Sequence, residues 1–174
     1  MLLELGASFD ETILTFAAQG NSMSLIKTFA DKYPHISKRD LTKQVFYEQC
    51  KKNELDNVRF LLSIAEDEYK LSQENILLGF LYAVEAGNIP IVNLLLSSEY
   101  QLDINATQDF QQLQNVTALT IACANGKDNM ASFLISKGAD VNLASSDTMI
   151  PIVIAAEKGN TDVVRMLLDH DAVK

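Results

Sequence analysis

The chain has 174 residues, of which 48% are hydrophobic and 21% charged, which is typical of a folded domain with a buried core. Its formal net charge of −9 argues against a nucleic-acid binder, because phosphates require a basic face. The longest apolar run, residues 150–156, is far shorter than the ~20 residues that a membrane span needs. We therefore expect a cytoplasmic protein without a membrane span.

A recurring pattern divides the chain into units of similar length. Each unit has one small, flexible residue at a corresponding position, and these anchors are Gly20, Asn53, Gly87, Gly126 and Gly159. Successive anchors are 33, 34, 39 and 33 residues apart. Such a period is typical of a solenoid, whose units bury their cores against one another. Asn53 fits the series because Asn, after Gly, best tolerates the left-handed conformation that closes a helix.

Each anchor is expected to separate two helices. Seven residues before the anchors, a large apolar residue marks the inner face of the first helix: Ile13, Phe46, Phe80, Leu119 and Ile152. The second helix carries apolar pairs one turn apart, such as Leu95 and Leu96 after residues 91–92. Pro90, with Asn88 as a cap, predicts the start of one second helix, and Pro151 predicts the start of the last first helix.

Two motifs in the fourth unit are similar to the signature of ankyrin repeats. Residues 117–122 read Thr-Ala-Leu-Thr-Ile-Ala, which resembles the family's Thr-Pro-Leu-His-x-Ala, and residues 138–142 match its Gly-Ala-Asp-Val-Asn tail. The resemblance implies an all-α solenoid of about five helix-turn-helix repeats. No unit has the family's His, and the signature fades in the first two units. A tetratricopeptide array has a similar period of about 34 residues and is the alternative, but its Trp and Gly-Tyr signature is missing.

The expected domain organisation is a single array over residues 1–174. Its predicted units are a partial one at 1–10, followed by 11–42, 43–74, 75–113, 114–146 and 147–174. Solenoids normally end in polar capping units, and neither terminal segment resembles one. We therefore expect the chain to be part of a longer protein.

The cysteines and histidines, which could act in catalysis or bind a metal, are expected to have structural roles instead. Cys50 and Cys123 each lie three residues before an anchor, where other units have Ala or Val, so we expect two buried thiols that form no disulfide. His35 lies in a predicted loop, and His170 lies where a helix dipole favours a cation. Phosphate-binding and nucleophile motifs are missing from the sequence. The sequence therefore predicts no enzyme, no metal and no cofactor.

The ankyrin resemblance implies that a protein partner binds in a concave groove formed by the first helices and the turns. The predicted groove residues lie close to the anchors and are Tyr82, Glu48, Lys52, Asn88, Ile121, Asn125, Lys127, Ile154 and Lys158. Tyr82 lies at the centre, and Tyr is common among the residues that dominate binding energy. Ile121 and Ile154 have an alternative role, which is to pack between units.

A long connection provides a second candidate binding site. The 39-residue interval has six residues more than the last interval, and we expect them to form an extended finger at residues 108–115. Phe110, Gln112 and Leu113 would contact the partner there, because unusually long loops are often functional. The alternative is that Phe110 and Leu113 cover the edge of the array. Asn142 resembles a site of asparagine hydroxylation in ankyrin repeats of animal cells, although the same Asn also stabilises its own turn.

Three hypotheses for function follow. The first is a monomeric module that binds another protein and has no enzymatic activity. The second is a targeting segment of a larger protein, such as a bacterial effector in the cytosol of a host cell, whose activity lies outside residues 1–174. The third is an enzyme on this scaffold, which would need a deep pocket lined by several perturbed ionisable groups.

Overall fold

The computed structural model describes residues 38–64, 67–97, 99–144 and 150–170, together with the single positions 27 and 31. The predicted partial unit 1–10 and most of the unit 11–42, with Gly20, Ile13 and His35, lie outside the described residues. The helices are α3 (Lys38–Lys52), α4 (Leu55–Leu62), α5 (Gln73–Ala86), α6 (Ile89–Leu95), α7 (Ala118–Ala124), α8 (Asp128–Ser136), α9 (Pro151–Glu157) and α10 (Thr161–Asp169), and the strands are β1 (Gln108–Phe110) and β2 (Leu113–Val116).

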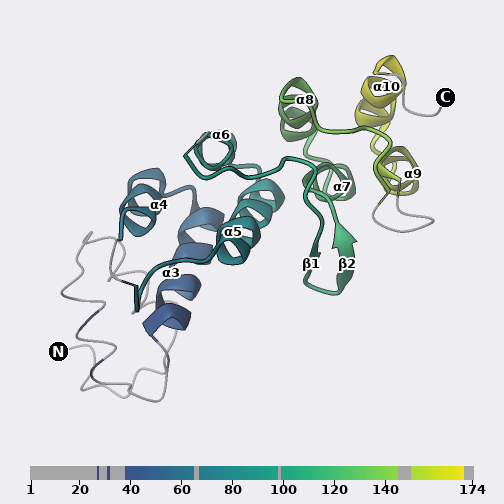
Figure 1. Cartoon of the computed structure of the whole chain (residues 1–174). Helices are drawn as coiled ribbons and strands as arrows, with labels where there is room; N and C mark the ends of the chain where they lie inside the picture. The colour runs from purple at the N-terminus through teal and green to yellow at the C-terminus, as the bar shows by residue number, and fades with distance from the viewer. Residues whose placement is uncertain are drawn as a thin grey trace, which may run out of the picture.

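The helices form four stacked pairs, α3 with α4, α5 with α6, α7 with α8, and α9 with α10. The first helices pack on one another in chain order, and the second helices lie along the other side of the array (Figure 1). This arrangement confirms the predicted all-α solenoid. Helix α3 begins at Lys38, before the predicted unit boundary at residue 43, and α5 begins at Gln73. The exact unit boundaries stay a prediction.

The four described anchors end their first helices in the same way. Asn53 has φ of 61°, in the left-handed region that Gly87, Gly126 and Gly159 also occupy, which confirms its predicted role. The backbone N–H of the residue that follows each anchor donates a hydrogen bond to the carbonyl of the residue four positions before that anchor. The pairs are Glu54 to Gln49, Asn88 to Ala83, Lys127 to Ala122 and Asn160 to Ala155, at 2.8 to 3.1 Å. One turn geometry is therefore repeated through the array.

The starts of the helices agree with the predicted signals. Asn88 occupies the N-cap position of α6 with Pro90 in its first turn, and α9 begins at Pro151. The side chain of Asn88 does not cap its own helix, however, because it bonds to the preceding unit instead. No helix in the described part of the chain combines the length and the apolar character that crossing a membrane requires.

The core runs continuously between units. Phe46 of α3 and Phe80 of α5 are fully buried. The ring of Phe46 lies directly against Gly79, so that a Cβ atom at Gly79 would overlap it. A glycine inside a helix lowers helix stability by ~1 kcal/mol relative to Ala, and here it allows the aromatic ring to lie against the backbone.

The predicted finger is a β-hairpin. Strand β1 pairs antiparallel with β2, and Phe110 lies opposite Leu113. Gln111, at the tip, has φ of 55°, a left-handed conformation that is unusual for a residue other than Gly, Asn or Asp. The extra residues of the 39-residue interval therefore form regular structure between α6 and α7.

The last described pair, α9 and α10, has large apolar side chains that are exposed. Val153 of α9 is 40% exposed and Leu168 of α10 is 56% exposed. The residues that correspond to Val153 in the two preceding units, Leu81 and Thr120, are completely buried. Within the described residues, no further helix packs on this side of α9 and α10.

A buried polar pair distinguishes the α3–α4 pair from the others. The amide of Asn57 donates to Oε1 of Gln49 at 3.0 Å, and both side chains are buried. The Nε2 atom of Gln49 has no hydrogen-bond partner. In the next unit the corresponding residues are Ala83 and Ile91, so an apolar pair fills the same place.

This difference leads to a prediction about stability. Gln49→Ala or Asn57→Ile alone should lower the free energy of unfolding by about 1–3 kcal/mol, because each leaves a buried amide unpaired. The double variant recreates the apolar pair of the next unit and should be at least as stable as the wild type. Urea denaturation followed by circular dichroism measures all three. A double variant as unstable as the sum of the single variants would contradict the prediction.

Candidate functional site

The predicted central residue, Tyr82, lies in a group of side chains contributed by two neighbouring units. Its ring centroid is 5.2 Å from that of Tyr47 on α3 and 4.8 Å from that of Phe110 on β1. The Nζ atom of Lys51 lies 4.4 Å from the centroid of the Tyr82 ring. We call Tyr47, Lys51, Tyr82 and Phe110 the Tyr82 cluster. It exists because α3, α5 and the hairpin meet at this point.

The hairpin is held against α5 by two contacts. Phe110 packs edge-on against Tyr82, and Gln111 donates from Nε2 to Oε1 of Glu85 at 2.7 Å. Phe110 is buried, so its side chain covers the array, as the alternative interpretation proposed, and is not free for a partner. Gln112 and Leu113 are exposed at the tip.

Polar groups border the Tyr82 cluster. Lys51 donates from Nζ to Oε1 of Glu48 at 2.8 Å, and Asn75 donates from Nδ2 to the hydroxyl oxygen of Tyr47 at 3.3 Å. Burial of the Tyr47 ring raises the pKa of its phenol to about 12, despite the opposing effect of the hydrogen bond from Asn75. Tyr47 therefore stays neutral at physiological pH.

Two of the predicted groove residues are core residues instead. Ile121 and Ile154, which correspond to Tyr82 in the next two units, are both buried. Their side chains are removed from solvent by neighbouring units, so they offer no surface to a partner. This corrects their assignment to the groove.

Exposed residues of the predicted groove lie near the turns. Lys52, Asn125 and Lys158 each precede an anchor and are exposed. Asn125 also donates from Nδ2 to the carbonyl of Ile121 at 3.0 Å, which closes its own helix. These three positions stay predicted partner contacts.

Asn88 has a structural role that the sequence prediction missed. Its Nδ2 donates to the carbonyl of Cys50 at 2.6 Å, and Asn160 donates in the same way to the carbonyl of Cys123 at 2.7 Å. Each Asn follows an anchor and ties its unit to the preceding one. The side chain of Asn88 therefore has a structural role within the array, and its contact with a partner stays a prediction. The recurrence of Asn after Gly87 and Gly159 was the available signal.

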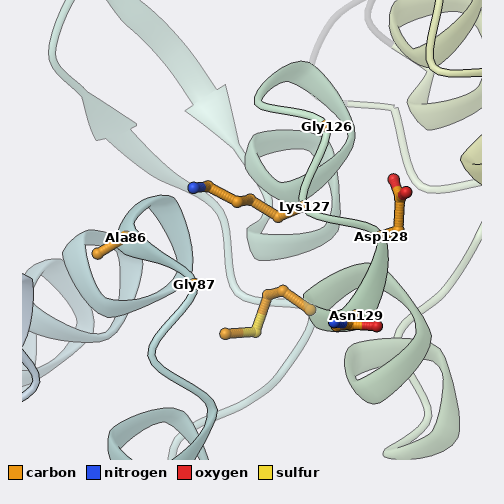
Figure 2. Close-up of a pocket in the computed structure, with 7 residues that line it drawn as sticks. Ala86, Gly87, Gly126, Lys127, Asp128 and Asn129 are labelled. Carbon is orange, nitrogen blue, oxygen red and sulfur yellow. The ribbon is translucent and has the colours of Figure 1, made fainter.

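Lys127 occupies the corresponding position in the unit between them and interrupts this series. An open cavity of about 350 Å³ lies there, between the turn at Gly87 and the turn at Gly126. Figure 2 shows Lys127 extending toward the end of α5, while Asp128 and Asn129 point away from it. The aliphatic part of Lys127 lies over Gly87. The junction between α5–α6 and α7–α8 thus lacks the hydrogen bond from an Asn side chain to a backbone carbonyl that Asn88 and Asn160 make at the other two junctions.

We predict that Lys127→Asn extends the series and stabilises the array. The new amide should reach the carbonyl of Val84, which corresponds to Cys50 and Cys123, and add about 1 kcal/mol to the free energy of unfolding. The reverse change, Asn160→Lys, should lower stability by a similar amount. Thermal unfolding of both variants checks the two predictions. A change in stability of the same sign for Lys127→Asn and Asn160→Lys would contradict them.

The cysteines have the buried environment that was predicted. Cys50 and Cys123 are free thiols with fully buried side chains. Burial raises the pKa of the Cys50 thiol, and burial followed by the nearby Asp128 raises the pKa of the Cys123 thiol to about 12. Both thiols therefore stay protonated at neutral pH and are poor nucleophiles. No group of three or more metal-ligating side chains occurs among the described residues.

Thiol labelling tests this environment. Ellman's reagent should label Cys50 and Cys123 about a hundredfold more slowly in the native chain than in urea, because thiolate and access are both required. Cys50→Ala and Cys123→Ala variants separate the two signals. Rapid labelling of either thiol in the native protein would show that it is not in the core.

Several residues of the site were not predicted from the sequence. Tyr47, Lys51, Glu85 and Gln111 lie at or beside Tyr82, but the residues predicted there from the sequence were Tyr82, Glu48 and Phe110 instead. Lys51 and Glu85 both lie two residues before an anchor, and this shared position in the repeat is the sequence signal that identifies them.

Comparison with known proteins gives a consistent result. The family profile described as ankyrin repeats, in three copies, matches residues 80–174, more than half of the chain. A Treponema pallidum protein described as ankyrin repeat-containing is 33% identical over 63% of this chain and 34% of its own length. The ankyrin repeat and KH domain-containing proteins of Caenorhabditis briggsae and Caenorhabditis elegans are 31% and 23% identical, over 51% and 91% of this chain. The chain covers 3% and 6% of their lengths.

Proposed function

Because the chain belongs to the ankyrin repeat family, whose repeats generally mediate protein–protein interaction, we propose that it is a non-enzymatic module that binds another protein at the Tyr82 cluster. The proposed surface also includes Glu48 and the exposed hairpin tip at Gln112 and Leu113. Lys52, Asn125 and Lys158 would contact the partner near the turns. The proposal includes a monomeric state and a cytoplasmic location.

The observation that carries the proposal is the way Tyr82 is held. Its ring is half-buried between Tyr47 and Phe110, so little side-chain entropy remains to be lost on binding. Aromatic residues fixed in this way near the centre of a surface contribute a large share of binding energy in other interfaces. The described residues around Tyr82 come from α3, α5 and β1, which supports a surface shared by two neighbouring units.

A pull-down from cell lysate tests this site. Tyr82→Ala should lose bound proteins that the wild type retains, with a loss of affinity of about thirtyfold, corresponding to about 2 kcal/mol for a dominant contact. Tyr100→Ala is the matched control, because Tyr100 follows α6 and lies near Arg59 of α4. If Tyr82→Ala and Tyr100→Ala recover the same proteins in equal amounts, the central assignment is wrong.

A second proposal is that these repeats target an activity encoded elsewhere in a longer protein, for example a bacterial effector. The short share of the relatives that the chain covers, 34% for the Treponema pallidum protein, supports it. The names of the two Caenorhabditis relatives include a KH domain besides the repeats. Sequencing the gene beyond the codon for Lys174 distinguishes the two proposals, because a second domain is either encoded or not.

A further inference from the structure

We propose that the partner presents a basic segment, and that one of its arginine side chains replaces Lys51 over the ring of Tyr82 and pairs with Glu48. This inference rests on the proposed function of the Tyr82 cluster and specifies the chemistry of the partner. It follows from a cation site that the chain already fills with its own side chain.

The first observation is the position of Lys51. Its Nζ lies 4.4 Å from the centroid of the Tyr82 ring and 2.8 Å from Oε1 of Glu48. The face of an aromatic ring attracts cations, and a carboxylate beside it adds an ion pair. Tyr82 and Glu48 therefore form a two-part site for a positive group.

The second observation is that the internal cation is easy to displace. The side chain of Lys51 is 38% exposed, whereas that of Glu48 is only 16% exposed. An ion pair between residues three apart in one helix contributes little to stability when its lysine lies partly in solvent, so we expect α3 to stay folded when another cation takes the place of Lys51. The carboxylate of Glu48 stays in place and, largely shielded from water, continues to favour a cation.

Arginine fits this site better than lysine does. A guanidinium is planar, so it can stack on the Tyr82 ring and at the same time donate two hydrogen bonds to the Glu48 carboxylate. Among the described residues, Glu48 accepts one hydrogen bond, from Lys51, which leaves acceptor capacity for a second donor. Guanidinium is also less strongly hydrated than ammonium, which favours its transfer to a half-buried ring.

Neighbouring side chains fix the position of the Tyr82 ring before a partner binds. Tyr47 and Phe110 fix the ring from two sides, and the bond from Gln111 to Glu85 fixes the hairpin that carries Phe110. The formal net charge of the chain is −9, from 23 acidic and 14 basic residues. A basic segment would therefore be steered toward this protein as a whole, and the Tyr82 cluster would select where it docks.

The test uses the full chain and a defined probe. The probe is a short, fluorescently labelled peptide of alternating Gly and Arg, and the reference is the same peptide with citrulline, which keeps the shape of Arg without its charge. Fluorescence anisotropy measures both affinities at low and at physiological salt. The arginine peptide should bind at least tenfold more tightly than the citrulline peptide at both salt concentrations.

Four variants locate the site. Lys51→Met removes the internal competitor and should tighten binding of the arginine peptide by about fivefold, an ion-pair-sized effect. Lys158→Met, at the other end of the array, makes the same change in net charge and should leave the affinity within twofold. Glu48→Gln and Tyr82→Leu should each weaken binding by about tenfold. Circular dichroism and thermal unfolding establish that all four variants fold.

The possible results distinguish this inference from the function on which it rests. Three results would each overturn the proposal of a basic partner. They are equal tightening by Lys51→Met and Lys158→Met, weaker binding by Lys51→Met, and equal affinity for the arginine and citrulline peptides. If that happens while Tyr82→Ala still loses its partner in the pull-down, the binding surface stands and only the chemistry of its ligand is wrong. If Tyr82→Ala retains its partner, the proposed site itself fails.

Discussion

Stacking of the first helices is the constraint on which the rest of the chain depends. A pair of short helices cannot enclose its own apolar side chains, so α3, α5, α7 and α9 must lie against one another. Ala83, Ala122 and Ala155, four residues before their anchors, are fully buried and let the helices of a unit approach closely. The α3–α4 pair meets the same constraint with the hydrogen-bonded amides of Gln49 and Asn57.

The candidate site is a product of this stacking. The Tyr82 cluster takes its members from α3, α5 and β1, so it is formed only when the two neighbouring units 43–74 and 75–113 are in contact. The hairpin does not project as a free arm, because Phe110 and Gln111 fasten it to α5. A local feature of one unit thereby becomes part of the surface of its neighbour, and the surface is as rigid as the array.

The spacing of the anchors in the sequence was sufficient to predict features that depend on one unit alone. It gave the left-handed Asn53, the start of α9 at Pro151 and the buried thiols, because each follows from local backbone or position in the period. It could not predict that Gly79 receives the ring of Phe46, or decide between a buried and a partner-facing Phe110. Those contacts depend on the distance and rotation between units, which a single-unit pattern does not contain.

The different number of packing neighbours of each described helix has a consequence for cooperativity. In a linear array each unit is stabilised by its own helices and by one interface on each side, and the last described pair has one such interface instead of two. Within the described residues, opening of α10 breaks contacts with α8 and α9, whereas opening of α5 breaks contacts with α3, α6, α7 and β1, so the backbone amides of α5 should be the more protected. The Tyr82 cluster is built on α5, so partner binding uses one of the most extensively packed helices of the described array.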